Sequence, residues 1–305
     1  MVERAVPNNG VVIWSEDFGD PSKPTCLLVM GYGTSSAAWS PSFVDALTSA
    51  GYHVIRYDNR DTGTSSSVDY ESTPYTLSDM AADGLAVMDA YGVERAHVIG
   101  LSMGGFLAQV LAIEHPERLL SLTIISSSPS STRHAMTLVG TPESAVLPPP
   151  EPAMQAAIAH TRSTPVPASL EDFVKERMLY LRAMSGLPEI TPLMEAEFRA
   201  TAEREFADSN GPQLSPRVDN HGLAIDASPA DRRADLRDVR LPTLVVHGTV
   251  DPIFPYPHAV AIAEAIPGAE LLRVEGMAHG MGDTHWSTVS SAVVKHLAAS
   301  MASSR

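Results

Sequence analysis

The sequence predicts an α/β protein built on a mostly parallel sheet with helices on both faces. Short apolar, β-branched runs alternate with helical patterns through residues 1–128, an order that favours parallel strand pairing. Over residues 129–236 prolines cluster and no strand pattern is visible, and the alternation resumes over residues 237–305. We therefore expect one α/β core formed by 1–128 and 237–305, with 129–236 inserted as a helical cap.

Each expected strand is a short apolar run bounded by turn residues. The strands are expected at residues 11–14, 26–30, 53–57, 97–100, 122–125, 241–248 and 269–274. Helical patterns cover residues 38–49, 77–90, 103–114, 257–266 and 285–299, with three more at 152–162, 170–185 and 192–208 in the expected cap. Thr76 and Asp79 have the spacing of a capping box, which marks the start of the second helix.

The composition disfavours several functional classes. The chain has 305 residues, of which 44% are hydrophobic, so a large core can form. The formal net charge of −15 disfavours nucleic acid as a partner. No apolar run is long enough to span a bilayer and no secretory pattern is visible at the N-terminus, so we expect no membrane association. The single cysteine, Cys26, lies in an apolar run, so we expect a core residue and a cytoplasmic protein.

Residues 96–109 read AHVIGLSMGGFLAQ and place Ser102 between an expected strand and an expected helix. Gly100, Ser102 and Gly104 form the pattern G-x-S-x-G. A strand that turns sharply into a helix forces the serine into a strained backbone conformation, and larger side chains two residues away would collide with neighbouring backbone. The apolar strand before the motif and the apolar helix after it favour a raised nucleophile over a flexible turn.

A nucleophilic serine needs a base and a carboxylate, which we expect at other strand ends. His279 lies in the loop after the strand 269–274, among glycines that let a loop present a side chain. His285 is a rival for this role, but it falls at the start of the last helix. Asp251 directly follows the strand 241–248, so we take it as the acid.

An oxyanion hole is expected to complete the site. One donor would be the backbone N–H of Met103, at a helix N-terminus. The other would be the N–H of Tyr32, in the loop that follows the strand 26–30.

Two other interpretations explain less. The loop Gly31-x-Gly33, followed by Asp58 at the end of the next strand, imitates a dinucleotide-binding fingerprint, but its third glycine is missing. His247 and Asp251 are four residues apart without an obvious third metal ligand, so His247 is expected in the core or supporting the site. We therefore expect no cofactor and no metal.

With these residues in place, the chain resembles α/β-hydrolases over nearly its whole length outside the expected cap. The stretches LLVMGYG, HVIRYDNRDTG, ERAHVIGLSMG, LPTLVVHGTVDPI and GMAHG resemble the branch of aclacinomycin methylesterase, a polyketide-tailoring esterase. Most relatives carry His-Gly ahead of the oxyanion loop, whereas this chain has Met30-Gly31, as that branch does. The resemblance implies the same nucleophile, acid, base and oxyanion donors: Ser102, Asp251, His279, Tyr32 and Met103.

The leading expectation is a cofactor-free serine carboxylesterase that acts on a small-molecule ester, with a polyketide-like methyl ester as one candidate. A C–C bond hydrolase of diketo acids is an alternative that needs a basic group in the pocket, for which Arg182 and Arg199 are candidates. Cofactor-free haloperoxidase or perhydrolase activity would use the same triad. A ligand receptor on this fold is disfavoured by an intact triad. The sequence leaves open the oligomeric state and both parts of the ester.

Overall fold

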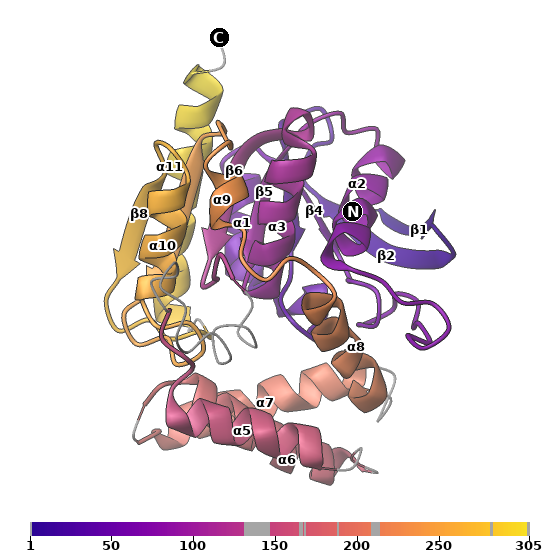
Figure 1. Cartoon of the computed structure of the whole chain (residues 1–305), viewed down its shortest axis with the longest axis vertical. Coiled ribbons are helices and arrows are strands. Elements are labelled where there is room, and N and C mark those ends of the chain that lie inside the picture. Colours follow the sequence, from indigo (N-terminus) through magenta and orange to yellow (C-terminus); the bar gives the residue numbers. More distant parts are fainter. Residues whose placement is uncertain are drawn as a thin grey trace.

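The computed structural model describes residues 2–130, 147–164, 167, 169–187, 189–208, 214–280 and 283–303. Its centre is an 8-stranded sheet in the order β1-β2-β4-β3-β5-β6-β7-β8 (Figure 1). The strands are β1 Glu3–Asn8, β2 Val11–Phe18, β3 Thr25–Val29, β4 His53–Tyr57, β5 Ala96–Leu101, β6 Leu119–Ile125, β7 Thr243–Gly248 and β8 Glu270–Val274. The helices are α1 Pro41–Ser49, α2 Leu77–Ala90, α3 Met103–Glu114, α5 Pro152–Ser163, α6 Leu170–Met184, α7 Pro192–Asp208, α8 Leu214–Asp226, α9 Arg233–Leu236, α10 Pro257–Ala265 and α11 Asp283–Ser303.

The sheet is mostly parallel, as the sequence predicts. β1 pairs with β2 and β2 pairs with β4 in antiparallel fashion, whereas all neighbours from β4 to β8 are parallel. The carboxyl ends of these six parallel strands therefore share one edge of the sheet, where ligands bind in open α/β folds.

The sequence patterns missed β1 and the second half of β2. β1 reads ERAVPN, which has no apolar alternation, and it forms by pairing with β2 at the sheet margin. In β2, Glu16 and Asp17 are buried because Arg56 donates to Glu16 at 2.7 Å and His53 bonds Asp17 at 3.0 Å. Buried polar residues whose partners lie far along the chain break the apolar pattern by which a strand is recognised in the sequence.

Helices cover both faces of the sheet. α1 and α11 pack together on one face, where Trp39, Phe43 and Trp286 form an aromatic cluster with ring centroids 5.0 to 6.0 Å apart. α2, α3 and α10 bury their apolar residues on the other face. The expected helix 38–49 is interrupted before Pro41, which occupies the first position of α1, where no backbone N–H is required. Cys26 is fully buried, as expected, and burial raises the pKa of its thiol.

The expected helices 152–162, 170–185 and 192–208 correspond to α5, α6 and α7, which pack side by side at one end of the molecule (Figure 1). α8 and α9 were not expected, because α8 reads LSPRVDNHGLAID and contains several weak helix formers. An isolated bridge between Ser130 and Asp231 joins the chain entering this segment to the chain leaving it. No helix among the described ranges is both long and apolar enough to cross a membrane.

We predict that His97→Gln flattens the pH dependence of folding stability. His97 is fully buried beside Ser121, and burial, aided by His296 and Arg95, lowers its pKa from 6.5 to about 4. Below about pH 6.5 the folded state therefore binds fewer protons than the unfolded chain. The contribution of His97 to the free energy of unfolding is complete above that pH and is lost as the pH falls toward 4. Within that window His97 contributes a slope of about 1.4 kcal/mol per pH unit.

Urea unfolding across this pH window would measure the slopes. Ser121→Ala is the matched control, because it removes the hydrogen bond of His97 but no titrating group, and it should keep the wild-type slope. Equal slopes for wild type and His97→Gln would contradict the prediction.

Candidate active site

The elbow at Ser102 has the strained geometry that its sequence predicts. β5 ends at Leu101, α3 begins at Met103, and Ser102 between them has φ 58° and ψ −118°. Its backbone N–H donates to the carbonyl of Ile125 at 2.9 Å, and its carbonyl accepts from the hydroxyl of Ser127 at 2.8 Å. These bonds to the neighbouring strand end stabilise a conformation that non-glycine residues adopt rarely.

The glycines around the elbow are required by close backbone contacts. A Cβ on Gly100 would lie 2.1 Å from the carbonyl oxygen of Gly104, and a Cβ on Gly104 would lie 2.0 Å from that of Val29. A Cβ on Gly105 would lie 2.6 Å from the side chain of Ser127. The start of α3 therefore lies directly against the ends of β3 and β6.

His279 and Asp251 meet Ser102 at the same edge of the sheet. The hydroxyl of Ser102 is 2.8 Å from Nε2 of His279, and Nδ1 of His279 is 2.9 Å from Oδ2 of Asp251. Asp251 follows β7 and His279 follows β8, and both are buried, whereas Ser102 is half-buried. Three strand ends thus bring together residues 28 and 177 positions apart in the chain.

Asp251 is held as a carboxylate by the groups around it. Burial opposes its ionisation, but the neighbouring His279 and its hydrogen bond, assisted by His247 and the N–H of Phe254, lower the pKa of Asp251 below its ordinary value. Its second oxygen, Oδ1, accepts from the N–H groups of Ile253 and Phe254, each at 2.9 Å. The carboxylate can only accept from Nδ1 of His279, which leaves the lone pair of Nε2 facing Ser102.

His247 supports this loop instead of forming a metal site. Its Nε2 donates to the carbonyl of Phe254 at 2.6 Å and lies 3.4 Å from Oδ2 of Asp251. Burial lowers the pKa of His247, which favours the neutral ring. In the part of the chain that the structure describes, no group of three or more His, Cys, Asp or Glu side chains is arranged so that it could hold a metal ion.

The two peptide groups expected to donate to an oxyanion belong to Met103, next to Ser102 in the chain, and to Tyr32, in the loop after β3. Met103 is the first residue of α3. Tyr32 follows Gly31, and a Cβ on Gly31 would lie 3.1 Å from Cβ of Ser102 and 3.6 Å from its hydroxyl oxygen. The loop after β3 therefore lies against the elbow.

The other residues singled out in the sequence have different roles. His285 lies in the first turn of α11, and the imidazole that bonds Ser102 is that of His279. Asp58 would be the ribose ligand of a dinucleotide fold, but its carboxylate accepts from the N–H and hydroxyl of Ser36 and from the N–H of Thr64. It therefore joins its own loop to the segment that follows β3.

Two further residues at this edge escaped the sequence analysis. Asn59 donates from its side chain to the carbonyl of Met30 at 3.0 Å, at the start of the loop that carries Tyr32. His221, on α8, accepts from the N–H of Gly33 at 3.1 Å, at the end of the same loop. Neither belongs to a local pattern, because each contact joins segments that are distant in the chain.

Comparison with known proteins agrees with this fold. The sequence model of a family described as alpha/beta hydrolase fold matches residues 24–285. The chain belongs to the α/β-hydrolase family. It is 34% identical over 302 residues to the rhodomycin D methylesterase DnrP of Streptomyces peucetius, covering 97% of this chain and 98% of that protein. It is 33% identical to the rhodomycin D methylesterase DauP of Streptomyces sp. (strain C5), with the same coverage.

A solved structure shows the same fold. The esterase RhEst1 from Rhodococcus sp. ECU1013 superposes with a TM-score of 0.75 at 22% identity, covering 98% of this chain and 99% of that one. Family and curated relatives together identify the protein as a hydrolase of the esterase type.

We predict that Gly104→Ala destabilises the protein by about 3 kcal/mol or more. The added Cβ would lie 2.0 Å from the carbonyl oxygen of Val29, and relief requires movement of α3 or β3. Gly84→Ala in α2 is the matched control, because its Cβ would meet no backbone, and its nearest atoms would be the ends of the Tyr57 and Leu27 side chains at 3.0 and 3.5 Å. Urea unfolding should show a change within about 1 kcal/mol for the control, and similar losses in both variants would contradict the steric explanation.

Proposed function

We propose that the protein is a serine carboxylic-ester hydrolase in which Ser102 is the nucleophile, His279 the general base and Asp251 the acid that orients it. The observation that carries this proposal is the continuous hydrogen-bonded line from the Ser102 hydroxyl through His279 to Asp251, with both distances below 3 Å. Such a line lets the imidazole accept the serine proton while the carboxylate stabilises the resulting imidazolium.

The reaction then proceeds in two halves. The Ser102 oxygen attacks the ester carbonyl carbon as its proton passes to Nε2 of His279. The N–H groups of Tyr32 and Met103 donate to the developing oxyanion, the most demanding charge in an acyl transfer. The imidazolium returns the proton to the departing alcohol, which leaves an acyl-enzyme on Ser102. A water molecule then attacks the acyl carbon as the same imidazole takes its proton, and the carboxylic acid departs as the imidazolium returns that proton to the Ser102 oxygen.

We infer that the substrate is a small methyl ester, with a polyketide-like acid as its acyl part. The support is the similarity to two rhodomycin D methylesterases at 33–34% identity over nearly the full length of each chain. Attack by Ser102 would then release methanol, and water would release the free acid.

Residues 129–236 are proposed to form the cap that selects this substrate, on a catalytic core of 1–128 and 237–305. Two contacts support this placement. The N–H of Glu151, before α5, donates to the carbonyl of Pro252, directly after Asp251. α8 reaches the loops after β3 and β4. The segment therefore meets the loops from which the proposed catalytic residues extend.

The alternative of C–C bond hydrolysis needs a basic group in the pocket, and the two arginines suggested for this role are paired with carboxylates. Arg182 forms an ion pair with Glu195, and Arg199 lies 3.7 Å from Glu171 and 3.5 Å from Glu203. Both arginines are about half exposed on α6 and α7, so their charges are compensated at the surface.

Ser102→Ala should lower the hydrolysis of p-nitrophenyl esters by about 10⁴-fold or more without a loss of stability, since the hydroxyl forms the acyl bond. The direct measurement is intact mass after treatment with a p-nitrophenyl phosphonate. Wild type should gain one phosphonyl group, mapped by peptide analysis to Ser102, and the variant none. Labelling of another serine in an active preparation would reject this nucleophile.

Asp251→Asn should lower kcat by about 10⁴-fold, because the amide favours the imidazole tautomer that places a proton between His279 and Ser102. Asp58→Asn replaces another buried carboxylate at the same edge and should keep kcat per folded molecule within about threefold. Steady-state kinetics, with the folded fraction measured by circular dichroism, gives both values. Equal losses in the two variants would show that Asp251 has no special role.

A further inference from the structure

His221 on α8 joins two loops at the catalytic edge of the sheet. Its side chain is fully buried. Nδ1 accepts from the N–H of Gly33 at 3.1 Å, and Nε2 donates to the carbonyl of Arg60 at 2.7 Å. A carbonyl can only accept and a peptide N–H can only donate, so these partners fix the neutral ring with its proton on Nε2.

The loop bonded by His221 is the one that carries Tyr32. Gly33 is the next residue and has φ 61°, and the ring of Tyr32 meets the His221 ring edge-on at 5.6 Å. At the other end of the loop, Asn59 donates to the carbonyl of Met30. Along the chain, the peptide N–H proposed to contact the oxyanion thus lies between two side-chain hydrogen bonds, one on each side.

We propose that His221 is a positioning residue of the oxyanion hole, which sets the direction of the Tyr32 N–H by holding the peptide unit after it. This inference rests on the proposed function of Ser102 and Tyr32. Oxyanion donors are effective because they are already aligned before charge develops, and the loss of one such donor lowers kcat by about 10²–10³-fold. A loop that rotates by a few tens of degrees would lose part of that effect.

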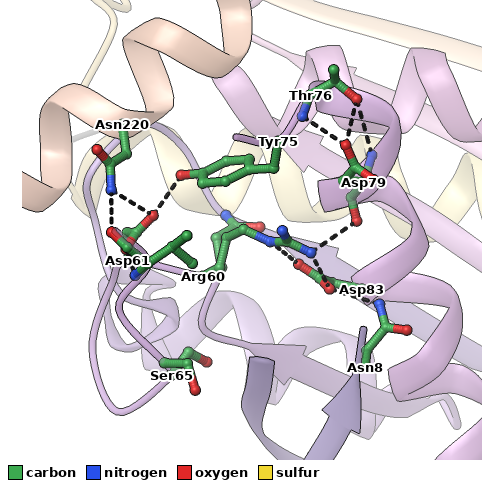
Figure 2. Close-up of polar contacts among 12 residues, drawn as sticks. Asn8, Arg60, Asp61, Ser65, Tyr75, Thr76, Asp79, Asp83 and Asn220 are labelled. Carbon is green, nitrogen blue, oxygen red and sulfur yellow. Dashed lines mark hydrogen bonds and ion pairs between the residues drawn. The ribbon is translucent and has the colours of Figure 1, made fainter. Parts of the chain in front are cut away.

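The second partner of His221 is the carbonyl of Arg60, a residue whose side chain is itself bonded. The Arg60 side chain forms a buried two-point ion pair with Asp83, at 2.7 and 2.8 Å (Figure 2). Asn220, beside His221 on α8, takes no part in this arrangement and bonds other residues, donating to Asp61 at 3.2 Å and to the carbonyl of Val68 at 2.9 Å. Figure 2 shows Asn220 and Tyr75 both directed at Asp61.

The electrostatic environment favours the neutral imidazole of His221, which is the form that this role requires. Burial lowers the pKa of His221, and the nearby Arg60 charge acts in the same direction, whereas the Arg60 carbonyl and Asp61 act against it. The net lowering favours the neutral ring, whose Nδ1 lone pair can accept from Gly33.

His221→Phe tests the proposal, because it keeps an aromatic ring and removes both hydrogen bonds. We expect kcat on a p-nitrophenyl ester to fall by about 10²-fold with KM within about threefold. The inhibition constant of a trifluoromethyl ketone, whose serine adduct carries an oxyanion, should rise in proportion to the loss of kcat/KM. His221→Gln keeps one donor and one acceptor, so its loss should be smaller, about tenfold.

Asn220→Ala is the matched control. It removes two hydrogen bonds from the same turn of α8 without touching the loop of Tyr32, and it should keep kcat within about threefold. Thermal unfolding of all variants separates a loss of stability from a loss of kcat. If His221→Phe does not fold, His221→Gln decides by the same measurements.

Two results would overturn the proposal. One is a folded His221 variant set with kcat and ketone inhibition within about threefold of wild type; the other is a loss matched by Asn220→Ala. Phosphonate labelling of the wild type tests the proposed function of Ser102 separately from the proposed role of His221. Labelling at Ser102 with unchanged His221 variants would reject only the role of His221, whereas absence of labelling at Ser102 would reject the proposed function and this role with it.

Discussion

The candidate site depends on how closely the first turn of α3 approaches the end of β3. Gly104 leaves no room for a Cβ against the carbonyl of Val29, so the helix starts directly over the strand ends. The chain must therefore reverse direction within one residue, and Ser102 adopts a positive φ of 58°. The loop after β3 lies against the same serine, since a Cβ on Gly31 would be 3.1 Å from Cβ of Ser102. Close backbone packing at these glycines thus shapes the surroundings of the proposed nucleophile.

The second determinant is a buried carboxylate whose oxygens are fully bonded. An isolated charge at Asp251 would be costly, since burial opposes its ionisation. Two backbone N–H groups bond one oxygen and His279 bonds the other. His247 adds a further contact to the loop by donating to the carbonyl of Phe254. The proton on His279 therefore has a defined position before any substrate arrives, which is the electrostatic preorganisation that acyl transfer needs.

Local patterns reveal the parts of this site that local geometry determines. The glycines around Ser102, and the positions of Asp251 and His279 just after apolar runs, follow from strand-to-loop geometry, and the structure brings all three together. β1, the polar half of β2 and the bridge made by His221 could not be read in this way. Their partners lie elsewhere in the chain; His221 bonds residues 161 and 188 positions away. Long-range hydrogen bonds between polar residues have no periodicity to detect.

The segment between β6 and β7 divides into two parts with different physical constraints. α6 and α7 share a small apolar cluster of their own, Phe173, Val174, Met178 and Ala202, and carry ion pairs on their exposed faces. The second half of α6 also packs against the main core, through Tyr180, Ala183 and Met184. α8 is bound instead by buried hydrogen bonds to the loops after β3 and β4, where a changed residue leaves a buried polar group without a partner. The exposed faces of α6 and α7 should therefore tolerate substitution better than α8, whose His221 is bonded to the loop that carries the proposed oxyanion donor Tyr32.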